Sequence, residues 1–273
     1  FNAAYHVTDL PSFLSRDFLV VFDPHCTTLP DASAAEPGKL LSFREDALAE
    51  RYPDTFAPYL VFGCDLTSEY PGTIFRLPLR TAAQAASSRI SKREYTAEAA
   101  EALLGSLAAR LSSAALFLTS VRSISLAIWR EGEPAPRLLR QLELSDVDAG
   151  ARRRDQLQRG LAAAGGNVRA LRPSTDYARG GLRLRGGSGD AEGAARWLIV
   201  QSIGGGRALA MCDEPLVLAH GLQPLPWAGV AARLAPSGGV EGQPFCLLPL
   251  PSFTGLPVHV NGFFEVSTNR RDI

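Results

Sequence analysis

The sequence predicts a mixed α/β fold of the α+β kind, arranged as two parts joined by a helix. Apolar runs of strand length, bounded by turn-forming residues, occur at 18–24, 72–80, 196–203 and 227–235. Between the second and third of these runs, residues 96–112 carry apolar side chains at helical spacing. With 273 residues, of which 46% are hydrophobic, the chain is long and apolar enough to bury a sizeable core.

The first part is expected to combine sheet and helix. FLVVFDP, at 18–24, is typical of a strand that runs into a proline turn, and GTIFRLPLR, at 72–80, predicts another strand. Residues 47–59 favour a short helix interrupted at Pro53, because proline cannot continue the hydrogen bonding of a helix interior.

A connecting helix is expected next. In residues 96–112 the side chains of Ala99, Leu103, Leu107 and Leu111 follow one another at intervals of four, which predicts one buried stripe. The chain is therefore divided into a first domain at 1–92, this connecting helix at 93–112 and a second α/β domain at 113–273.

The second domain is expected to contain several strands. The runs at 115–130 and 138–146, separated by a turn at Gly132 and Pro134, predict a hairpin, and residues 152–164 favour a helix. Residues 196–203 and 227–235 are predicted to be buried strands.

Near the end of the chain, Val258, Val260, Phe264 and Val266 flank an Asn-Gly pair at 261–262. This dipeptide between alternating apolar residues is the strongest short-range signal for a hairpin turn.

Composition limits the function classes. The 28 basic and 28 acidic side chains balance, which argues against an electrostatic grip on nucleic acid or on an anionic membrane. The four cysteines show no CxxC spacing, so neither a zinc site nor a disulfide scaffold is indicated. No apolar run approaches the roughly 18 residues that span a bilayer. A soluble protein of a reducing, cytoplasmic compartment is expected.

Two patterns are interpreted as surface features. The glycine-rich stretches at 180–193 and 204–206 match neither a phosphate loop nor a dinucleotide fingerprint, and they are assigned to surface loops. The basic cluster at 152–154 is interpreted as a solvated helix face rather than as a contact for an acidic partner.

Five segments, in this order, carry a family resemblance: FNAAYHVTDLPSF, VVFDPHCTTLP, GTIFRLPLR, LFLTSVRSISL and LPLPSFTGLPVHVNGFFEVSTNRRDI. The chain resembles, from its first residue to its last, the repeated ATPase-like region of the Sacsin/Nov family. Because it opens without an initiator methionine and stops on NRRDI, we expect it to be a fragment of a larger protein.

The resemblance implies that the first domain is the distal part of a GHKL ATPase-like (Bergerat) sandwich, related to the ninety-kilodalton heat-shock chaperone. Phe1 and Asn2 would match the residues just after a Gly-x-Gly phosphate loop, where a helix amino end faces the nucleotide. Thr73 would match the strand threonine beside the adenine pocket. Arg270 and Arg271 are the candidates for an arginine that reaches the terminal phosphate.

The resemblance also implies ATP and magnesium as cofactors of the intact parent. In that family the acidic residue that activates water, the magnesium-holding Asn and the Asp that reads adenine all lie upstream of the phosphate loop. They are not in these 273 residues, so we expect the chain by itself neither to hydrolyse ATP nor to bind it tightly. The implied function is that of a molecular chaperone or co-chaperone, with the seventy-kilodalton heat-shock system and client proteins as partners.

Three alternatives stay open. The chain could come from a non-catalytic scaffold with an ATPase-like fold, or from a GHKL protein of DNA metabolism related to MutL or a topoisomerase, although the neutral charge weighs against the latter. An unrelated hydrolase would have to use His25, His220 or His259, and no nucleophile elbow accompanies them. These histidines are interpreted as packing or surface residues.

Overall fold

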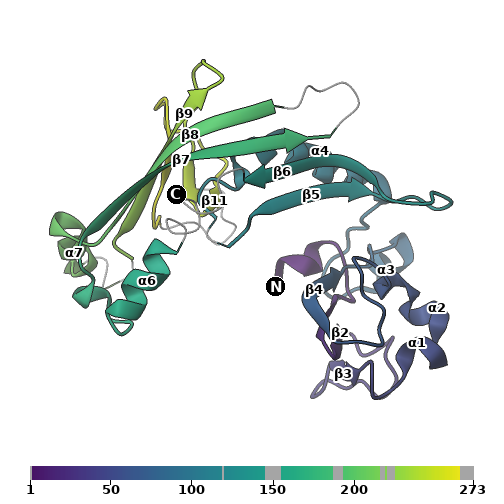
Figure 1. The fold of residues 1–273 in the computed structure, drawn as a ribbon. Coiled ribbons are helices and arrows are strands. Elements are labelled where there is room, and N and C mark those ends of the chain that lie inside the picture. The colour runs from purple at the N-terminus through teal and green to yellow at the C-terminus, as the bar shows by residue number, and fades with distance from the viewer. Residues whose placement is uncertain are drawn as a thin grey trace. The chain divides into compact units, whose positions relative to one another are not determined.

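A computed structural model describes residues 2–118, 120–144, 155–186, 193–215, 219 and 225–264. It confirms a mixed α+β fold, with the chain divided into one unit at 1–103 and another at 104–273 (Figure 1). The GHKL character of the first unit remains a prediction, and each unit is described by itself below.

The first unit is built on a four-stranded antiparallel sheet in the order β3-β2-β1-β4. Its elements are η1 (Asn2–His6), β1 (Ser12–Arg16), β2 (Phe18–Phe22), β3 (Gly38–Ser42), α1 (Leu48–Arg51), α2 (Pro53–Phe56), η2 (Ala57–Tyr59), β4 (Tyr70–Arg76) and α3 (Ala82–Ser87). The strands expected within 18–24 and 72–80 are thus confirmed as β2 and β4. The helix expected at 47–59 is confirmed as α1 and α2, with the break at Pro53. Pro53 is the first residue of α2, where a backbone N–H would have no partner within the helix, so proline costs no hydrogen bond there.

One face of this sheet forms the core of the unit. Leu14, Leu19 and Ile74 are on the same face by strand alternation, and all three are buried. Phe43, Leu48, Phe56 and Tyr59, from the segments around α1 and α2, pack against them. The other face therefore carries the alternate residues of each strand, including Phe13, Ser15, Thr73 and Phe75.

The second unit is built on an eight-stranded sheet in the order β11-β10-β12-β9-β8-β7-β6-β5, which is strongly twisted (Figure 1). Its elements are β5 (Ser123–Ile128), β6 (Arg137–Leu144), α6 (Gln156–Ala163), η3 (Val168–Ala170), β7 (Ser174–Arg185), β8 (Gly193–Ile203), α7 (Gly206–Cys212), β9 (Trp227–Ala235), β10 (Pro244–Cys246), β11 (Leu248–Pro249) and β12 (His259–Asn261). The expected β5–β6 hairpin and the buried strands β8 and β9 are confirmed. Apart from the parallel β10–β12 pair, neighbouring strands are antiparallel.

The helix α4 (Ala97–Ala114) contains the division between the units. Its buried stripe differs from the expected one, because Leu103 and Leu107 are exposed while Leu104 and Ala108 pack on the core with Leu111. Side chains spaced four residues apart are displaced by about 40° around an α-helix at each step, so after three such steps the side chain no longer lies on the buried face. The mixed spacing of four and then three stays on it.

The Asn-Gly pair does not make the expected turn. Asn261 is the last residue of β12, opposite Gly229 of β9, and its Oδ1 accepts a hydrogen bond from the Leu247 amide at 2.9 Å. Neither residue of the pair has the positive φ that a type I′ turn requires. The buried side-chain bond and the pairing with β9 and β10 decide the conformation instead.

The glycine-rich stretch at 180–193 is also different from the expectation. Its residues 180–185 belong to β7, while residues 187–192 lie outside the described residues. Gly204 and Gly205 do form a loop, with φ values of 66° and 91° between β8 and α7. The helix expected at 152–164 is present as α6, and the basic cluster at 152–154 lies outside the description.

Candidate functional site

Thr73, the site residue that the sequence places in the adenine region, lies on the exposed face of the first sheet. It stands directly opposite Ser15 in the β1–β4 pairing. The Thr73 hydroxyl donates to Ser15 Oγ at 3.1 Å, and the Ser15 hydroxyl donates to the Gly72 carbonyl at 3.0 Å. Thr73 is exposed and Ser15 is partly buried, so this hydroxyl pair is open to a ligand on the face away from the core.

An aromatic pair lies next to the hydroxyl pair. Phe13 and Phe75 are paired across β1 and β4, two residues from Ser15 and Thr73, and strand alternation puts all four on one face. The two ring centroids are 5.9 Å apart with the planes tilted by 43°. Phe75 is 60% exposed. The β1–β4 face therefore carries two tilted aromatic rings next to two hydroxyl groups.

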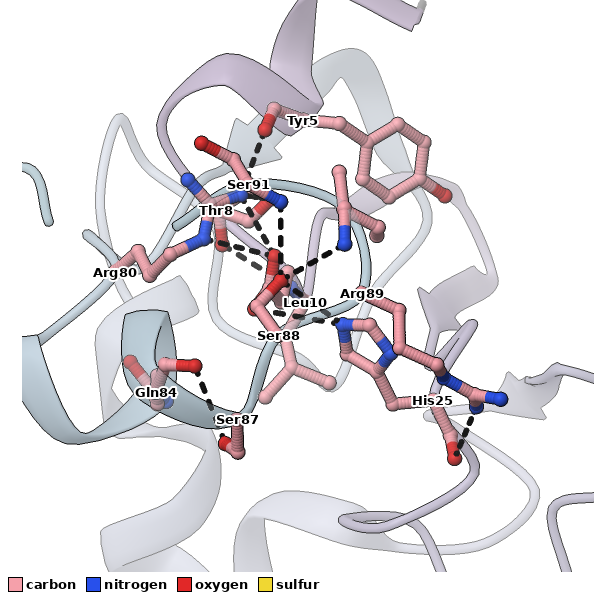
Figure 2. Close-up of polar contacts among 12 residues, drawn as sticks. Tyr5, Thr8, Leu10, His25, Arg80, Gln84, Ser87, Ser88, Arg89 and Ser91 are labelled. Atoms are coloured by element: carbon pink, nitrogen blue, oxygen red, sulfur yellow. Dashed lines mark hydrogen bonds and ion pairs between the residues drawn. The ribbon is translucent and has the colours of Figure 1, made fainter. Parts of the chain in front are cut away.

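Beyond the end of β4 the chain carries a buried arginine, Arg80, which sequence reasoning did not identify. Arg80, labelled in Figure 2, is 1% exposed. Its guanidinium contacts the Asp9 carboxylate through Nε at 2.9 Å and Nη2 at 2.6 Å. Its remaining N–H groups donate to the carbonyls of Tyr5, Thr8, His6 and Arg93. Arg80 thus links three parts of the unit by hydrogen bonds. These are η1 with the residues just after it, the segment that precedes α4, and the segment that follows β4, the strand of Thr73.

The same contacts keep the Asp9 carboxyl group ionised. Burial raises the pKa of the Asp9 carboxyl, but hydrogen bonds from Arg80 and Ser88, together with the positive charge of Arg80 and the proximity of His25, outweigh burial and hold its pKa below the usual range. A buried carboxylate and a buried guanidinium form an ion pair in which each charge compensates the other, so loss of either partner leaves an uncompensated buried charge. The cluster is accordingly a structural clasp.

His25 does not form a hydrolase triad. Its Nε2 lies 3.3 Å from Ser88 Oγ (Figure 2). The same nitrogen lies 3.5 Å from Asp9 Oδ2. A Ser-His-Asp relay needs the serine and the carboxylate on different ring nitrogens, whereas both contacts here use the same one. Ser88 is also 2% exposed, so its hydroxyl is closed to a substrate.

His259 is a core residue. It is 4% exposed, and its ring contacts those of Trp197 and Phe245, at centroid distances of 5.4 and 5.2 Å. Its Nδ1 accepts the Gln243 amide at 3.2 Å. Burial, and then the charge of Arg233, lower the pKa of the imidazole. The interpretation of this residue as a packing histidine is confirmed.

In the described part of the structure, the other predicted site residues are not found beside Thr73. Asn2 begins η1, and nothing is described of its side chain. Phe1, His220, Arg270 and Arg271 lie outside the described residues. Their assignments remain predictions.

Five residues escaped sequence reasoning: Phe13, Ser15 and Phe75 on the β1–β4 face, and the buried pair Asp9 and Arg80. Ser15 sits in a strand, β1, whose SFLSR pattern was not identified as one. Asp9 and Arg80 each lie two residues from a proline, with a leucine between, at TDLP and RLPLR, and nothing in these short patterns marks them as a buried pair. Their 71-residue separation hides the partnership from any local pattern.

The second unit contains an apolar cavity of about 580 Å³ where β8, β9 and β12 meet α7. Its lining includes Met211, Trp227, Val260 and Phe263. None of the site residues predicted from the sequence is among its described lining. In the described part of the chain, no three His, Cys, Asp or Glu side chains gather closely enough to hold a metal ion. Over the same residues, no helix is both long and apolar enough to cross a membrane.

Comparison with known proteins agrees with the segments on which the resemblance rests. The model of the family described as the Sacsin domain matches residues 1–141, which include the whole first unit, the hydroxyl pair and the Arg80 clasp. Human sacsin is 28% identical over 277 aligned residues, which cover 100% of this chain. The chain spans 6% of the length of that relative. Because the family model covers more than half of its residues, the chain belongs to the Sacsin domain family.

Proposed function

We propose that this chain is a part of a sacsin-like molecular chaperone or co-chaperone, in which an ATPase-like region couples nucleotide state to protein folding or quality control. The first unit would be the distal part of a GHKL sandwich, and Thr73 would lie beside the adenine of a bound ATP. Family membership supports the first statement. The exposed position of Thr73, next to the Phe13–Phe75 pair, is the observation that carries the second.

The residues present fit one end of a nucleotide. An adenine ring makes apolar contacts on its faces and hydrogen bonds at its edge, and the β1–β4 face carries both aromatic rings and hydroxyl groups. For magnesium, the described residues offer no ligand set, so no catalytic step is assigned to the metal here. Arg270 or Arg271 is proposed to reach the terminal phosphate, a task that suits a permanently charged, forked side chain.

The Arg80 clasp supports a coupling role for this unit. It ties the η1 carbonyls of Tyr5 and His6, the Asp9 carboxylate and the Arg93 carbonyl to a single buried side chain. Movement of η1 would therefore strain the segment that leads to α4. We propose that a nucleotide at the β1–β4 face acts through this connection, in a cytoplasmic protein that works with the seventy-kilodalton heat-shock system and its clients.

The experiment measures Mg-ATP binding by calorimetry and turnover by phosphate release. Two proteins are compared: this chain, and a longer protein that also includes the segment upstream of Phe1. Binding and hydrolysis by the longer protein, weakened by Thr73→Val but not by Thr81→Val on the same unit, would support the proposal. Binding without turnover would favour a scaffold, and no binding by either protein would refute a nucleotide function. Tight binding by the short chain would show that the upstream residues are dispensable.

A further inference from the structure

The second unit contains another cavity, of about 500 Å³, between α6, the segment that precedes β7 and the end of β8. Its lining includes Gln156, Gly160 and Ala163 of α6, together with Arg172 and Ile203. The three residues of α6 share one face of the helix, because they follow one another at intervals of four and three. A Cβ at Gly160 would lie 3.2 Å from the Ile203 side chain, so glycine allows the helix to approach the sheet here. The cavity contains none of the residues proposed for the nucleotide site.

The wall of this cavity carries a buried hydrogen-bond acceptor. Gln156 is 8% exposed, and its Nε2 donates to the Ser174 hydroxyl at 2.8 Å and to the Ser174 carbonyl at 3.3 Å. Because a carbonyl can only accept, these bonds keep the amide nitrogen toward Ser174 and turn Oε1 away from it. In the described structure Gln156 Oε1 is buried and has no hydrogen-bond partner. A ligand that brings a donor to this oxygen would remove the cost of leaving it unpaired.

Positive charge lines the same cavity on its solvent side. Arg159 of α6 and Arg172, which precedes β7, are both in the lining and both exposed. Since Arg159 also takes part in another interaction within the chain, we assign the ligand contact to Arg172. A guanidinium group is permanently charged, and its forked N–H groups match the oxygens of a carboxylate or a phosphate.

We propose that this cavity binds a small organic oxyanion, a carboxylate or a phosphate ester, that also carries hydroxyl groups. The anionic group would lie at Arg172, and a hydroxyl would donate to Gln156 Oε1. The positive charges of the two arginines disfavour an ammonium group as that donor. Ala163 and Ile203 give the carbon skeleton an apolar contact, and a volume of about 500 Å³ suits a compound of the size of a hexose derivative. The inference is independent of the nucleotide site at Thr73.

The test measures binding to this chain by calorimetry, with gluconate and glucose 6-phosphate as probes. Glucose, which has no anionic group, should bind at least about tenfold more weakly than glucose 6-phosphate, because it lacks the charge-assisted bond to Arg172. Hexanoate, which has the carbon chain and carboxylate of gluconate without its hydroxyls, should bind about three- to tenfold more weakly than gluconate. Binding of either probe supports the site, and the stronger of the two identifies its anionic group. No binding of either at millimolar concentration, or equal binding of gluconate and hexanoate, would overturn the inference.

Substitutions with matched controls locate the site. Arg172→Met should weaken binding at least about tenfold, whereas Arg207→Met, at an exposed arginine of α7 outside the described lining, should leave it unchanged. Ala163→Phe should block the cavity, and Ala162→Phe, at the neighbouring exposed position of α6 outside that lining, should not. Urea unfolding without ligand distinguishes a blocked cavity from a destabilised unit, and the exposed Arg172 can be replaced without loss of the fold. Binding that survives both Arg172→Met and Ala163→Phe would place the ligand elsewhere and refute the assignment.

Discussion

Replacement of Arg80 by Met should selectively unfold the first unit. The substitution keeps the volume of the side-chain stem but leaves the Asp9 carboxylate, 7% exposed, without its guanidinium. Removal of one partner from a buried ion pair costs about 3–5 kcal/mol, because the remaining charge stays buried. The carbonyls that lose a donor are those of Tyr5, His6, Thr8 and Arg93. Since a domain of this size has only about 5–15 kcal/mol of stability, the loss should be plain in urea.

The distribution of aromatic residues makes the assay selective. Trp129, Trp197 and Trp227, which are all of the tryptophans, lie in the second unit, so their fluorescence follows that unit. Hydrogen exchange of the amides in residues 1–103 follows the first unit. We expect Arg80→Met to lower the protection of those amides and to leave the tryptophan transition unchanged.

Arg44→Met is the matched control. Arg44 belongs to the same unit, but its ion pair with Asp17, at 3.2 Å, is solvent-exposed, with side-chain exposures of 46% and 34%. Such pairs contribute about 0–1 kcal/mol. Arg80→Lys should fall between the two variants, since it keeps the charge and loses the fork. If Arg80→Met costs no more than Arg44→Met, the clasp does not hold the unit together and the reasoning is refuted.

Three further predictions concern the second unit and α4. Because burial and Arg233 lower the pKa of His259 in the folded state, its contribution to stability is complete above the unfolded value of about 6.5 and is lost as pH falls through the lowered folded pKa. Urea unfolding between pH 5 and 7 should show this slope, at most about 1.4 kcal/mol per pH unit, and His259→Phe should flatten it. Gly229→Ala should cost about 1–3 kcal/mol, because a Cβ there would lie 3.1 Å from a ring carbon of Phe117. Gly105→Ala, where a Cβ meets nothing within 4 Å inside a helix, should stabilise by up to about 1 kcal/mol in thermal unfolding.

Each of these predictions has a result that contradicts it. An acid slope that survives His259→Phe would assign the pH dependence to other groups. Equal changes in melting temperature for Gly229→Ala and Gly105→Ala would mean that the contact with Phe117 relaxes freely.

Local patterns were sufficient for elements whose signals lie within a few residues. The strands β2, β4, β8 and β9, the β5–β6 hairpin and the break at Pro53 follow from apolar runs and from proline geometry, which act over one turn or one strand. The family resemblance, carried by five segments, located Thr73 on a strand of the first unit. The same local reasoning missed β1, β3 and β7, because SFLSR, GKLLS and the glycine-containing β7 have weak alternation and gain their stability from neighbouring strands.

The amino-acid sequence thus determined the α+β class and the membership of a family, both of which depend on composition and on contiguous segments. Only the tertiary structure decided that Ser15 orients the Thr73 hydroxyl, 58 residues away, and that Arg80 is paired with Asp9. It also decided that Asn261 extends a strand in place of a turn. The physical reason is common to all three: a buried or cross-strand hydrogen bond is set by strand register and by burial, and neither is encoded in the spacing of nearby residues.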